Sequence, residues 1–483
     1  MKFLALSLLV YGGLTAWVAS RVDATTEEWT YTFSHLALAA ALNAHLLHAA
    51  RARSLALLSP PVVFLLVSQL YFTINGLKYF SPILLYPQFE LSLTAQFVGS
   101  VAGAVVLFAC ALLLRTQRGP TSARVLGWIC GYWPDLRRLL LVSVAGSLAC
   151  KAALFMLGYG SPYADTEFTE HVVRSYADFF LILGNETFGL SSLLLGSLYL
   201  MRPRVGDRRR PLTAAAAFVG VLTQVAHMLL FIKARMILLV TAVIVALTAE
   251  IRSRRTAERL LALLFLALPP VSLLGMQLTL LLGRINVPEE TGLRLAIGAI
   301  NRRADLTDFA TAIVVNSAGE AHDAGIVTSA ALNAVPLVVF PGKREIVKDV
   351  YSKILNEHLG WPAYEGGIML ADYQDSAFSA GVMSFGVVGF ALVPLALIWL
   401  LYQAARGLER IFKRSGYGLA LLALSLAAMR VEVEWATIPL SLRQAVLVGV
   451  IFWTVVWAAR EGHRILMVAS RPAAGITPRG GPA

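Results

Sequence analysis

Charged residues are scarce in this chain, and their scarcity excludes a soluble globular domain. Asp, Glu, Lys and Arg make up 14% of the 483 residues, whereas an average soluble domain carries about 25%. Such a chain cannot cover its whole surface with groups that favour water. Hydrophobic residues instead form 57% of the sequence, and the mean hydropathy is +0.69. We therefore expect most of the chain to lie in a lipid bilayer.

Cysteine is also rare, and the common catalytic signatures are missing. The three cysteines, Cys110, Cys130 and Cys150, stand far apart without a CxxC pair or a histidine partner, so neither a zinc site nor a disulfide framework is expected. No HExxH, Walker, DxD or GxSxG pattern occurs. We therefore expect no metal ion and no cofactor. The net charge of +12 comes from short basic clusters between apolar runs, which does not indicate a nucleic-acid partner.

Apolar runs of membrane-spanning length recur along the chain. A helix needs about 20 apolar residues to cross a hydrocarbon core roughly 30 Å thick. Backbone polar groups in that core must be satisfied within the protein, so long apolar runs must be helices. The sequence predicts an all-α polytopic membrane protein with about 12 transmembrane helices, at residues 3–20, 31–50, 54–77, 94–114, 139–158, 175–200, 212–232, 236–250, 260–282, 377–402, 417–436 and 441–459.

Basic residues alternate between successive loops, and this alternation gives the orientation. One set of loops holds more than half of the 41 Lys and Arg residues, including Arg51, Arg53 and the run at 208–210. The intervening loops are acidic or mixed, as at residues 23–28 and 165–170. Cytoplasmic loops carry the excess of Lys and Arg. The pattern therefore predicts that both termini lie in the cytoplasm.

One non-cytoplasmic segment is much longer than the other loops. It spans residues 283–376 and contains aromatic residues and amphipathic stretches at 293–300 and 344–355. We expect short helices there, lying on the membrane face, and long ordered loops often carry function. The predicted division of the chain is 1–282 with helices one to nine, 283–376 as the extracytoplasmic loop, 377–460 with helices ten to twelve, and 461–483 as a cytoplasmic tail.

Cations at the outer ends of predicted helices are candidates for binding an anion. Lys233 and Arg235 join two predicted helices almost without a loop, and ionisable residues at such depth are functional candidates. The alternative is that their side chains only extend to the membrane interface. Arg302 and Arg303 lie on a predicted amphipathic helix. Guanidinium groups bind phosphate oxygens in pairs, so these two arginines are candidate diphosphate ligands.

The acidic companions of Arg302 leave its role open. Asp305 and Asp308 follow it closely, so the alternative is a solvated helix face that pairs with itself. A Pro-framed turn before Lys343 and Arg344 could direct two further cations inward.

Other charged residues lie near the ends of the last predicted helices. Arg430 is either a further phosphate ligand or the partner of the glutamates that follow it. Asp372 and Asp375 precede the predicted helix at 377–402. A helix N-terminus favours acidic residues through its dipole, and a carboxylate there is also a candidate general base for a sugar hydroxyl.

Two ionisable residues lie inside predicted membrane helices. Lys151 and Glu186 stand at similar depth in the helices at 139–158 and 175–200. The sequence favours a buried ion pair between them that holds the two helices together.

The layout and the motifs of the second half resemble the oligosaccharide repeat-unit polymerases of bacterial surface polysaccharides, the Wzy-type O-antigen and exopolysaccharide polymerases. The shared layout is about twelve helices with cytoplasmic termini and one large external loop late in the chain. The motif-like stretches are Lys233-Ala-Arg235-Met-Ile-Leu-Leu, Arg302-Arg303 with Asp305, Phe340-Pro341-Gly342-Lys343, and the run from Asp372 to Gly389 with its Phe-Gly-x-x-Gly. Lys233-Ala replaces the commoner Gly-Ser pair, and the family's Pro-Arg dipeptide is absent.

The resemblance implies a metal-independent, GT-C-like glycosyltransferase of the bacterial inner membrane. Its substrate would be an undecaprenyl-diphosphate-linked oligosaccharide, and its partners the lipid bilayer, a chain-length regulator and a flippase. It would assign Arg235 with Asp305, Asp372 and Asp375 to catalysis. The implied diphosphate ligands are Lys233, Arg235, Arg302, Arg303, Lys343, Arg344 and Arg430.

Two other functions remain open at this point. An O-antigen ligase shares the architecture and would use an external-loop histidine, for which His322 and His358 are the candidates. A transporter of lipid-linked oligosaccharide or another solute would show repeated halves around a central site, and no internal repeat is visible in the sequence.

Overall fold

The fold is all-α over the part of the chain that is described. The computed structural model describes residues 2–53, 59–80, 91–116, 133–158, 176–201, 211–230, 289–316 and 376–412, with scattered positions in 259–277, 332–342 and 446–461. None of these residues forms a strand. The elements are α1 (Lys2–Ala19), α2 (Thr26–Arg53), α3 (Pro60–Ile74), η1 (Asn75–Phe80), α4 (Leu93–Thr116), α6 (Trp133–Met156), α7 (Tyr176–Met201), α8 (Pro211–Leu230), α11 (Glu289–Ala304), α12 (Asp308–Asn316) and α15 (Ala377–Phe412).

The predicted membrane helices agree with the described ones. Elements α1, α2, α3 with η1, α4, α6, α7, α8 and α15 coincide with predicted runs to within a few residues at most ends. The predicted start at residue 54 is too early, because α3 begins with Pro60 and Pro61, which fit the first turn of a helix. The described positions within 260–282 and 441–459 are helical. The predicted runs at 236–250 and 417–436 lie outside the described residues.

Membrane insertion follows from the length and composition of these helices. Within the described residues, five helical stretches are long and apolar enough to cross a membrane: Pro60–Phe80, Leu93–Leu114, Arg137–Met156, Phe180–Ser197 and Ala377–Leu408. The protein is therefore a multi-pass membrane protein. The count of about twelve stays a prediction.

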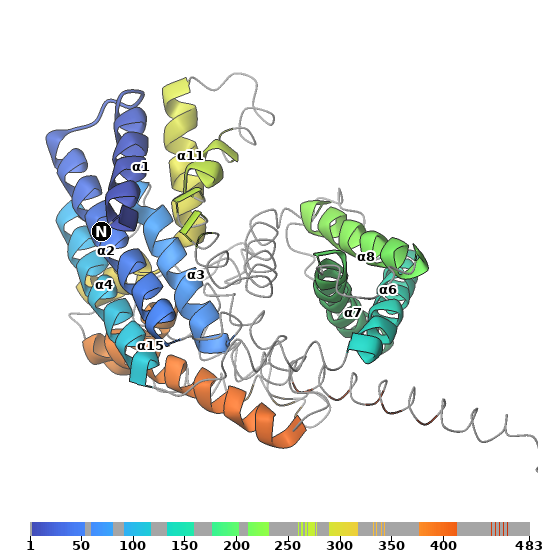
Figure 1. Cartoon of the computed structure of the whole chain (residues 1–483). Helices are drawn as coiled ribbons and strands as arrows, with labels where there is room; N and C mark the ends of the chain where they lie inside the picture. The colour runs from blue at the N-terminus through green and yellow to red at the C-terminus, as the bar shows by residue number, and fades with distance from the viewer. Residues whose placement is uncertain are drawn as a thin grey trace, which may run out of the picture.

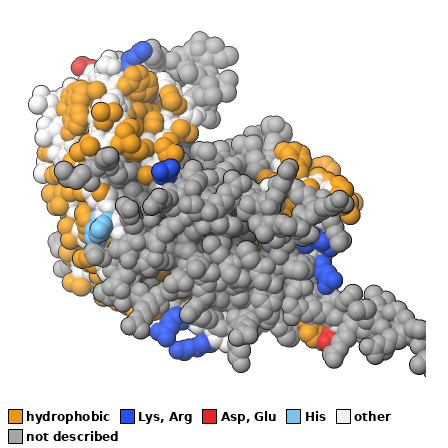
Figure 2. All heavy atoms as spheres, in the orientation of Figure 1, with side chains coloured by type: hydrophobic (Ala, Val, Ile, Leu, Met, Phe, Trp, Pro, Cys, Tyr) orange, Lys and Arg blue, Asp and Glu red, His pale blue; other side chains and the backbone are white. Residues whose placement is uncertain are grey.

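The helices pack in two groups (Figure 1). The first, called the large bundle below, contains α1, α2, α3, η1, α4, α11, α12 and α15. The second is formed by α6, α7 and α8, which pack against one another. Apolar side chains cover much of the described surface of both groups, and Lys and Arg side chains appear there in a few places (Figure 2). An apolar surface of this kind suits contact with lipid tails rather than water.

The centre of the large bundle is the stretch formed by α3 and η1. All of its residues except Leu66 are buried, and its neighbours are α2, α4, α11 and α15. A helix that is hydrophobic on every side is expected at the centre of a bundle. The surprise is that its last turn carries a lysine, Lys78, that is 2% exposed.

The helix α15 is broken near its start. Phe385 and Gly386 depart from helical geometry, and Gly386 has φ 63° and ψ −154°, a conformation open to glycine and strained for other residues. The chain folds back there, so that Gly381 and Gly389 meet backbone to backbone without room for a Cβ atom. The Phe-Gly-x-x-Gly run noted in the sequence therefore forms the bend of a helical hairpin.

The segment after residue 283 contains short helices, as predicted, but α12 does not lie on a membrane face. Residues 308–313 are buried, and α12 packs against α4 and α15 inside the large bundle. The expectation of surface helices is wrong for α12. The physical reason is its composition, because the run Phe309 to Val315 has no charged residue and gains free energy by leaving water.

Candidate functional site

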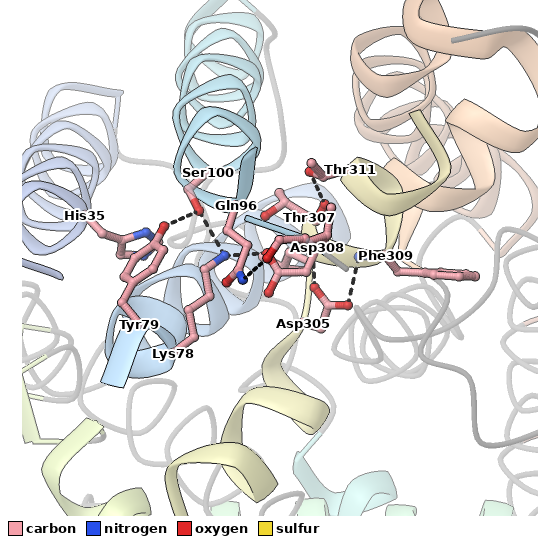
Figure 3. Close-up of polar contacts among 12 residues, drawn as sticks. His35, Lys78, Tyr79, Gln96, Ser100, Asp305, Thr307, Asp308, Phe309 and Thr311 are labelled. Carbon is pink, nitrogen blue, oxygen red and sulfur yellow. Dashed lines mark hydrogen bonds and ion pairs between the residues drawn. The ribbon is translucent and has the colours of Figure 1, made fainter. Parts of the chain in front are cut away.

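A buried ion pair joins η1 to α12 in the large bundle. The Nζ of Lys78 donates to Asp308 Oδ1 at 2.5 Å and to Ser100 Oγ at 3.0 Å (Figure 3). The ring of Tyr79 lies 5.3 Å from the same Nζ, and its hydroxyl is 3.1 Å from Ser100 Oγ. The lysine ammonium therefore has partners from three elements, η1, α4 and α12.

A second carboxylate, that of Asp305, caps α12. Its Oδ1 accepts the backbone N–H of Asp308 at 2.8 Å, and its Oδ2 accepts that of Phe309 at 3.2 Å. Two otherwise unpaired N–H groups of the first turn are thereby satisfied. The positive end of the helix dipole also favours a negative charge at this place. Lys78 and the helix N-terminus thus compensate two buried carboxylates between them.

Small residues on α4 allow α12 to approach closely. Gly99 and Gly103 are one helical turn apart and face Thr311 and Thr307 of α12. A Cβ atom on Gly103 would come within 2.6 Å of Thr307 Cγ2, and one on Gly99 would overlap Thr311 Oγ1. Glycines at this spacing are the usual means by which helices approach in membranes. Ser100, beside Gly99, is thereby brought to the lysine.

The start of α15 is fastened to the start of α12. Ser376 Oγ donates to the carbonyl of Leu306 at 2.5 Å. Ser376 and Ser379 also cap each other, because each side-chain oxygen accepts the backbone N–H of the other residue. The last residue of the 283–376 segment therefore meets the turn between α11 and α12 at one buried point.

Arg294 of α11 joins three parts of the chain that the charge pattern predicts on one side of the membrane. Its Nη1 donates to the carbonyl of Phe80 at 3.0 Å, and its Nη2 donates to the carbonyl of Asp23 at 2.6 Å. Asp23 follows α1, Phe80 ends η1, and Arg294 lies in the 283–376 segment. These contacts confirm that the three parts lie at the same end of the large bundle.

A buried histidine extends the polar cluster toward α2. His35 Nε2 lies 2.7 Å from the carbonyl of Phe72, and its ring stacks on that of Phe72 with centroids 4.3 Å apart. The ring edge meets Tyr79 at 5.9 Å. The Nδ1 atom is buried and has no hydrogen-bond partner among the described residues. His35 therefore places a second ionisable ring next to the Lys78 pair (Figure 3).

Few of the predicted site residues fall in the described part of the chain. Asp305 is described, and both of its carboxylate oxygens are engaged in capping α12. Arg302 and Arg303 lie in the last turn of α11, as the amphipathic pattern predicted, and their side chains are outside the description. The remaining predicted residues, Lys233, Arg235, Lys343, Arg344, Asp372, Asp375 and Arg430, lie outside the described residues.

The sequence pattern did not indicate Lys78, His35 or Ser100, and it marked Asp308 only as a companion of Asp305. A signal for Lys78 was present, because a lysine at the end of an apolar run stands at membrane depth. Nothing in the sequence pairs it with Asp308, which lies 230 residues further on.

Lys151 links the helices at 139–158 and 175–200, as predicted, through a hydrogen bond, while its ion pair with Glu186 stays a prediction. Lys151 Nζ of α6 donates to Asn185 Oδ1 of α7 at 2.7 Å. The side chain of Glu186, the predicted partner, is not described. Among the described residues, no three His, Cys, Asp or Glu side chains gather closely enough to hold a metal ion.

Comparisons with protein families, curated proteins and solved structures find no match to this chain. The fold class and the candidate site therefore rest on the residues of this chain. They define a multi-pass α-helical membrane protein with a buried charged cluster at one end of its large bundle.

Proposed function

We propose that the protein is a membrane glycosyltransferase that polymerises undecaprenyl-diphosphate-linked oligosaccharide repeat units into a surface polysaccharide or exopolysaccharide. The reaction takes place at the outer leaflet of a bacterial inner membrane, with both termini of the protein in the cytoplasm. The proposal is supported by the resemblance to repeat-unit polymerases together with the position of Arg302 and Arg303 in the last turn of α11.

The observation that carries this proposal is the anchoring of the α11–α12 corner. Arg302 and Arg303 occupy the last turn of α11, and Asp308, five residues after Arg303, is held in the bundle by Lys78. The same helix is bonded through Arg294 to the carbonyls of Phe80 and Asp23, which fixes the element that carries both arginines at one end of the bundle. This is where the diphosphate of a lipid-linked substrate would lie if that end faces the outer leaflet.

The reaction requires from the protein mainly cations near the leaving group and a base near the acceptor hydroxyl. A hydroxyl of the acceptor sugar attacks the anomeric carbon of the donor glycan, and the bond from that carbon to the diphosphate oxygen breaks. The electron pair leaves with the undecaprenyl diphosphate, whose growing charge Arg235, Arg302, Arg303 and Arg430 stabilise. The hydroxyl proton passes to a carboxylate, for which Asp372 and Asp375 are the better candidates. Asp305 is the weaker candidate because two backbone N–H groups occupy its oxygens.

A transporter is the second candidate, and the buried Lys78–Asp308 pair is the observation that favours it. Ion pairs at membrane depth are costly and often mark the path of a proton or an ion. The ligase alternative, with His322 or His358 as the catalytic base, differs from the polymerase only in its acceptor. Both histidines lie outside the described residues.

Deleting the gene in the source organism separates these functions. Loss of a polymerase leaves single repeat units on the cell surface, whereas loss of a ligase leaves lipid-linked polymer in the membrane. Loss of a lipid flippase leaves repeat units on the cytoplasmic leaflet. Complementation with Arg235→Ala or with Arg302→Ala/Arg303→Ala should restore the protein level without restoring long chains. Full-length glycan from both variants would contradict the proposal.

A further inference from the structure

The Lys78–Asp308 pair carries a desolvation penalty that a purely structural contact between two helices would avoid. Taking a lysine and an aspartate out of water costs several kcal/mol for each ion, and apolar residues of similar size often hold helices together equally well. The glycine seam of Gly99 and Gly103 already packs α12 on α4. The charges therefore supply something that shape alone does not, namely a fixed direction and distance between η1 and α12.

The turn that contains Lys78, η1, contacts α11 as well as α12. The turn η1 packs against α11, and its last carbonyl, that of Phe80, accepts a hydrogen bond from Arg294 of α11. Lys78, two residues earlier in η1, binds the first residue of α12. One short turn thus holds both helices that flank the corner at residues 305–307.

The corner between the two helices is short and internally fixed. Asp305 caps α12, and the carbonyl of Leu306 is bonded to Ser376. Arg302 and Arg303 come immediately before this corner, in the last turn of α11. A shift of α12 relative to η1 is transmitted to these arginines through only a few residues of constrained chain.

We propose that Lys78 is a positioning residue for Arg302 and Arg303, which it orients toward the diphosphate of a lipid-linked substrate through Asp308 and the α11–α12 corner. This inference rests on the proposed function, because it assumes that the two arginines bind a diphosphate. Lys78 itself does not touch the substrate, since its ammonium already has Asp308, Ser100 and the ring of Tyr79 as partners.

The test compares stability with binding of undecaprenyl diphosphate by the full-length protein in lipid nanodiscs. Lys78→Met alone leaves Asp308 buried without its cation and should lower the melting temperature. Lys78→Met/Asp308→Met removes both charges and should melt near the wild-type temperature. If Lys78 positions the arginines, this double variant should bind undecaprenyl diphosphate about 10-fold more weakly than the wild type despite its normal stability. That is a difference of about 1.4 kcal/mol in binding free energy.

A mutant cycle decides whether the effect passes through the arginines. In an Arg302→Ala/Arg303→Ala background, adding Lys78→Met/Asp308→Met should weaken binding no further, because residues that act as a unit are not additive. The matched control is Lys151→Met, which removes a hydrogen-bonded lysine between α6 and α7 and should leave the dissociation constant unchanged.

The outcomes separate this inference from the function on which it rests. Wild-type protein that does not bind undecaprenyl diphosphate overturns both. Wild-type protein that binds it, together with a Lys78→Met/Asp308→Met variant that binds equally well, overturns only the positioning role. Additive losses in the arginine-free background also overturn it, because Lys78 would then act by another route.

Discussion

Replacing Gly99 with alanine should separate α12 from α4, because Thr311 of α12 occupies the space that the new methyl group would need. A Cβ atom built on Gly99 overlaps Thr311 Oγ1 and lies 3.2 Å from Thr311 Cβ and 3.3 Å from its Cγ2. The threonine cannot simply rotate away, since its hydroxyl donates to the carbonyl of Thr307 at 2.7 Å and its side chain is β-branched. Either α12 moves outward or the threonine leaves its preferred rotamer.

The expected loss is moderate in size. Forcing an extra carbon into a packed interior costs about 1–3 kcal/mol, while alanine in place of glycine gains up to about 1 kcal/mol of helix propensity. The overlap with Thr311 Oγ1 is severe, so the packing cost lies in the upper part of its range, and the net loss for Gly99→Ala should be roughly 1–2 kcal/mol.

A second substitution tests whether the contact with Thr311 causes this loss. Thr311→Ala removes the overlapping oxygen and the Cγ2 methyl, which leaves only the Cβ at 3.2 Å. The Thr307 carbonyl stays satisfied because the backbone N–H of Thr311 also donates to it at 2.8 Å. Gly99→Ala/Thr311→Ala should therefore be almost as stable as Thr311→Ala, with a coupling energy of about 1 kcal/mol or more in favour of the double variant.

The measurement is the free energy of unfolding from SDS titration in mixed micelles, followed by tryptophan fluorescence. The control is Gly407→Ala in α15, where a Cβ atom would meet nothing within 4 Å, so no loss of stability is expected. A Gly99→Ala protein as stable as the wild type would refute the close approach of α4 and α12. Failure of Thr311→Ala to rescue it would refute the contact assigned here.

Two further predictions concern Asp305 and Arg294 in the 283–376 segment. Asp305→Ala should lower the free energy of unfolding by about 1–2 kcal/mol because it removes the cap of α12, whereas Asp305→Asn should keep most of the stability. If a stable Asp305→Asn protein no longer makes glycan, Asp305 also takes part in the reaction. Arg294→Lys should lose nearly as much stability as Arg294→Ala, because one ammonium cannot reproduce the forked donors that reach the carbonyls of Phe80 and Asp23; wild-type stability of Arg294→Lys in the SDS titration would contradict this bridge.

The membrane helices were predictable because each is decided by local composition. The run at 94–114 differs from α4 mainly at its ends, since about 20 apolar residues specify a spanning helix whatever surrounds them. The run at 377–402 is also helical, but Phe385 and Gly386 break α15 near its start. The bend of α15 could not be predicted from its glycine-rich run, because glycines at this spacing also occur in straight helices. The placement of α12 was missed, since a run as short as Asp308–Asn316 is too short for hydropathy to distinguish a buried helix from a surface one.

The candidate site was predicted poorly for a different reason. The position of a charge along the chain is all that the sequence shows, and that position favoured Arg302, Arg303 and Asp305. The pair that forms the buried centre, Lys78 and Asp308, becomes visible only when η1, α4 and α12 are packed together. Its two members lie in different helices, and no local pattern relates them.

The amino-acid sequence by itself determined that this protein is a multi-pass membrane protein, that its described elements are helices, and that the segments after α1 and η1 lie at the same end of the large bundle as Arg294. Those properties follow from sums over neighbouring residues, namely hydropathy and the sign of charge in loops. Tertiary structure alone decided that α12 enters the bundle along Gly99 and Gly103, and that Lys78 meets Asp308 there. Such contacts depend on the shape and burial of surfaces that are far apart in the chain, and these exist only after the helices have packed.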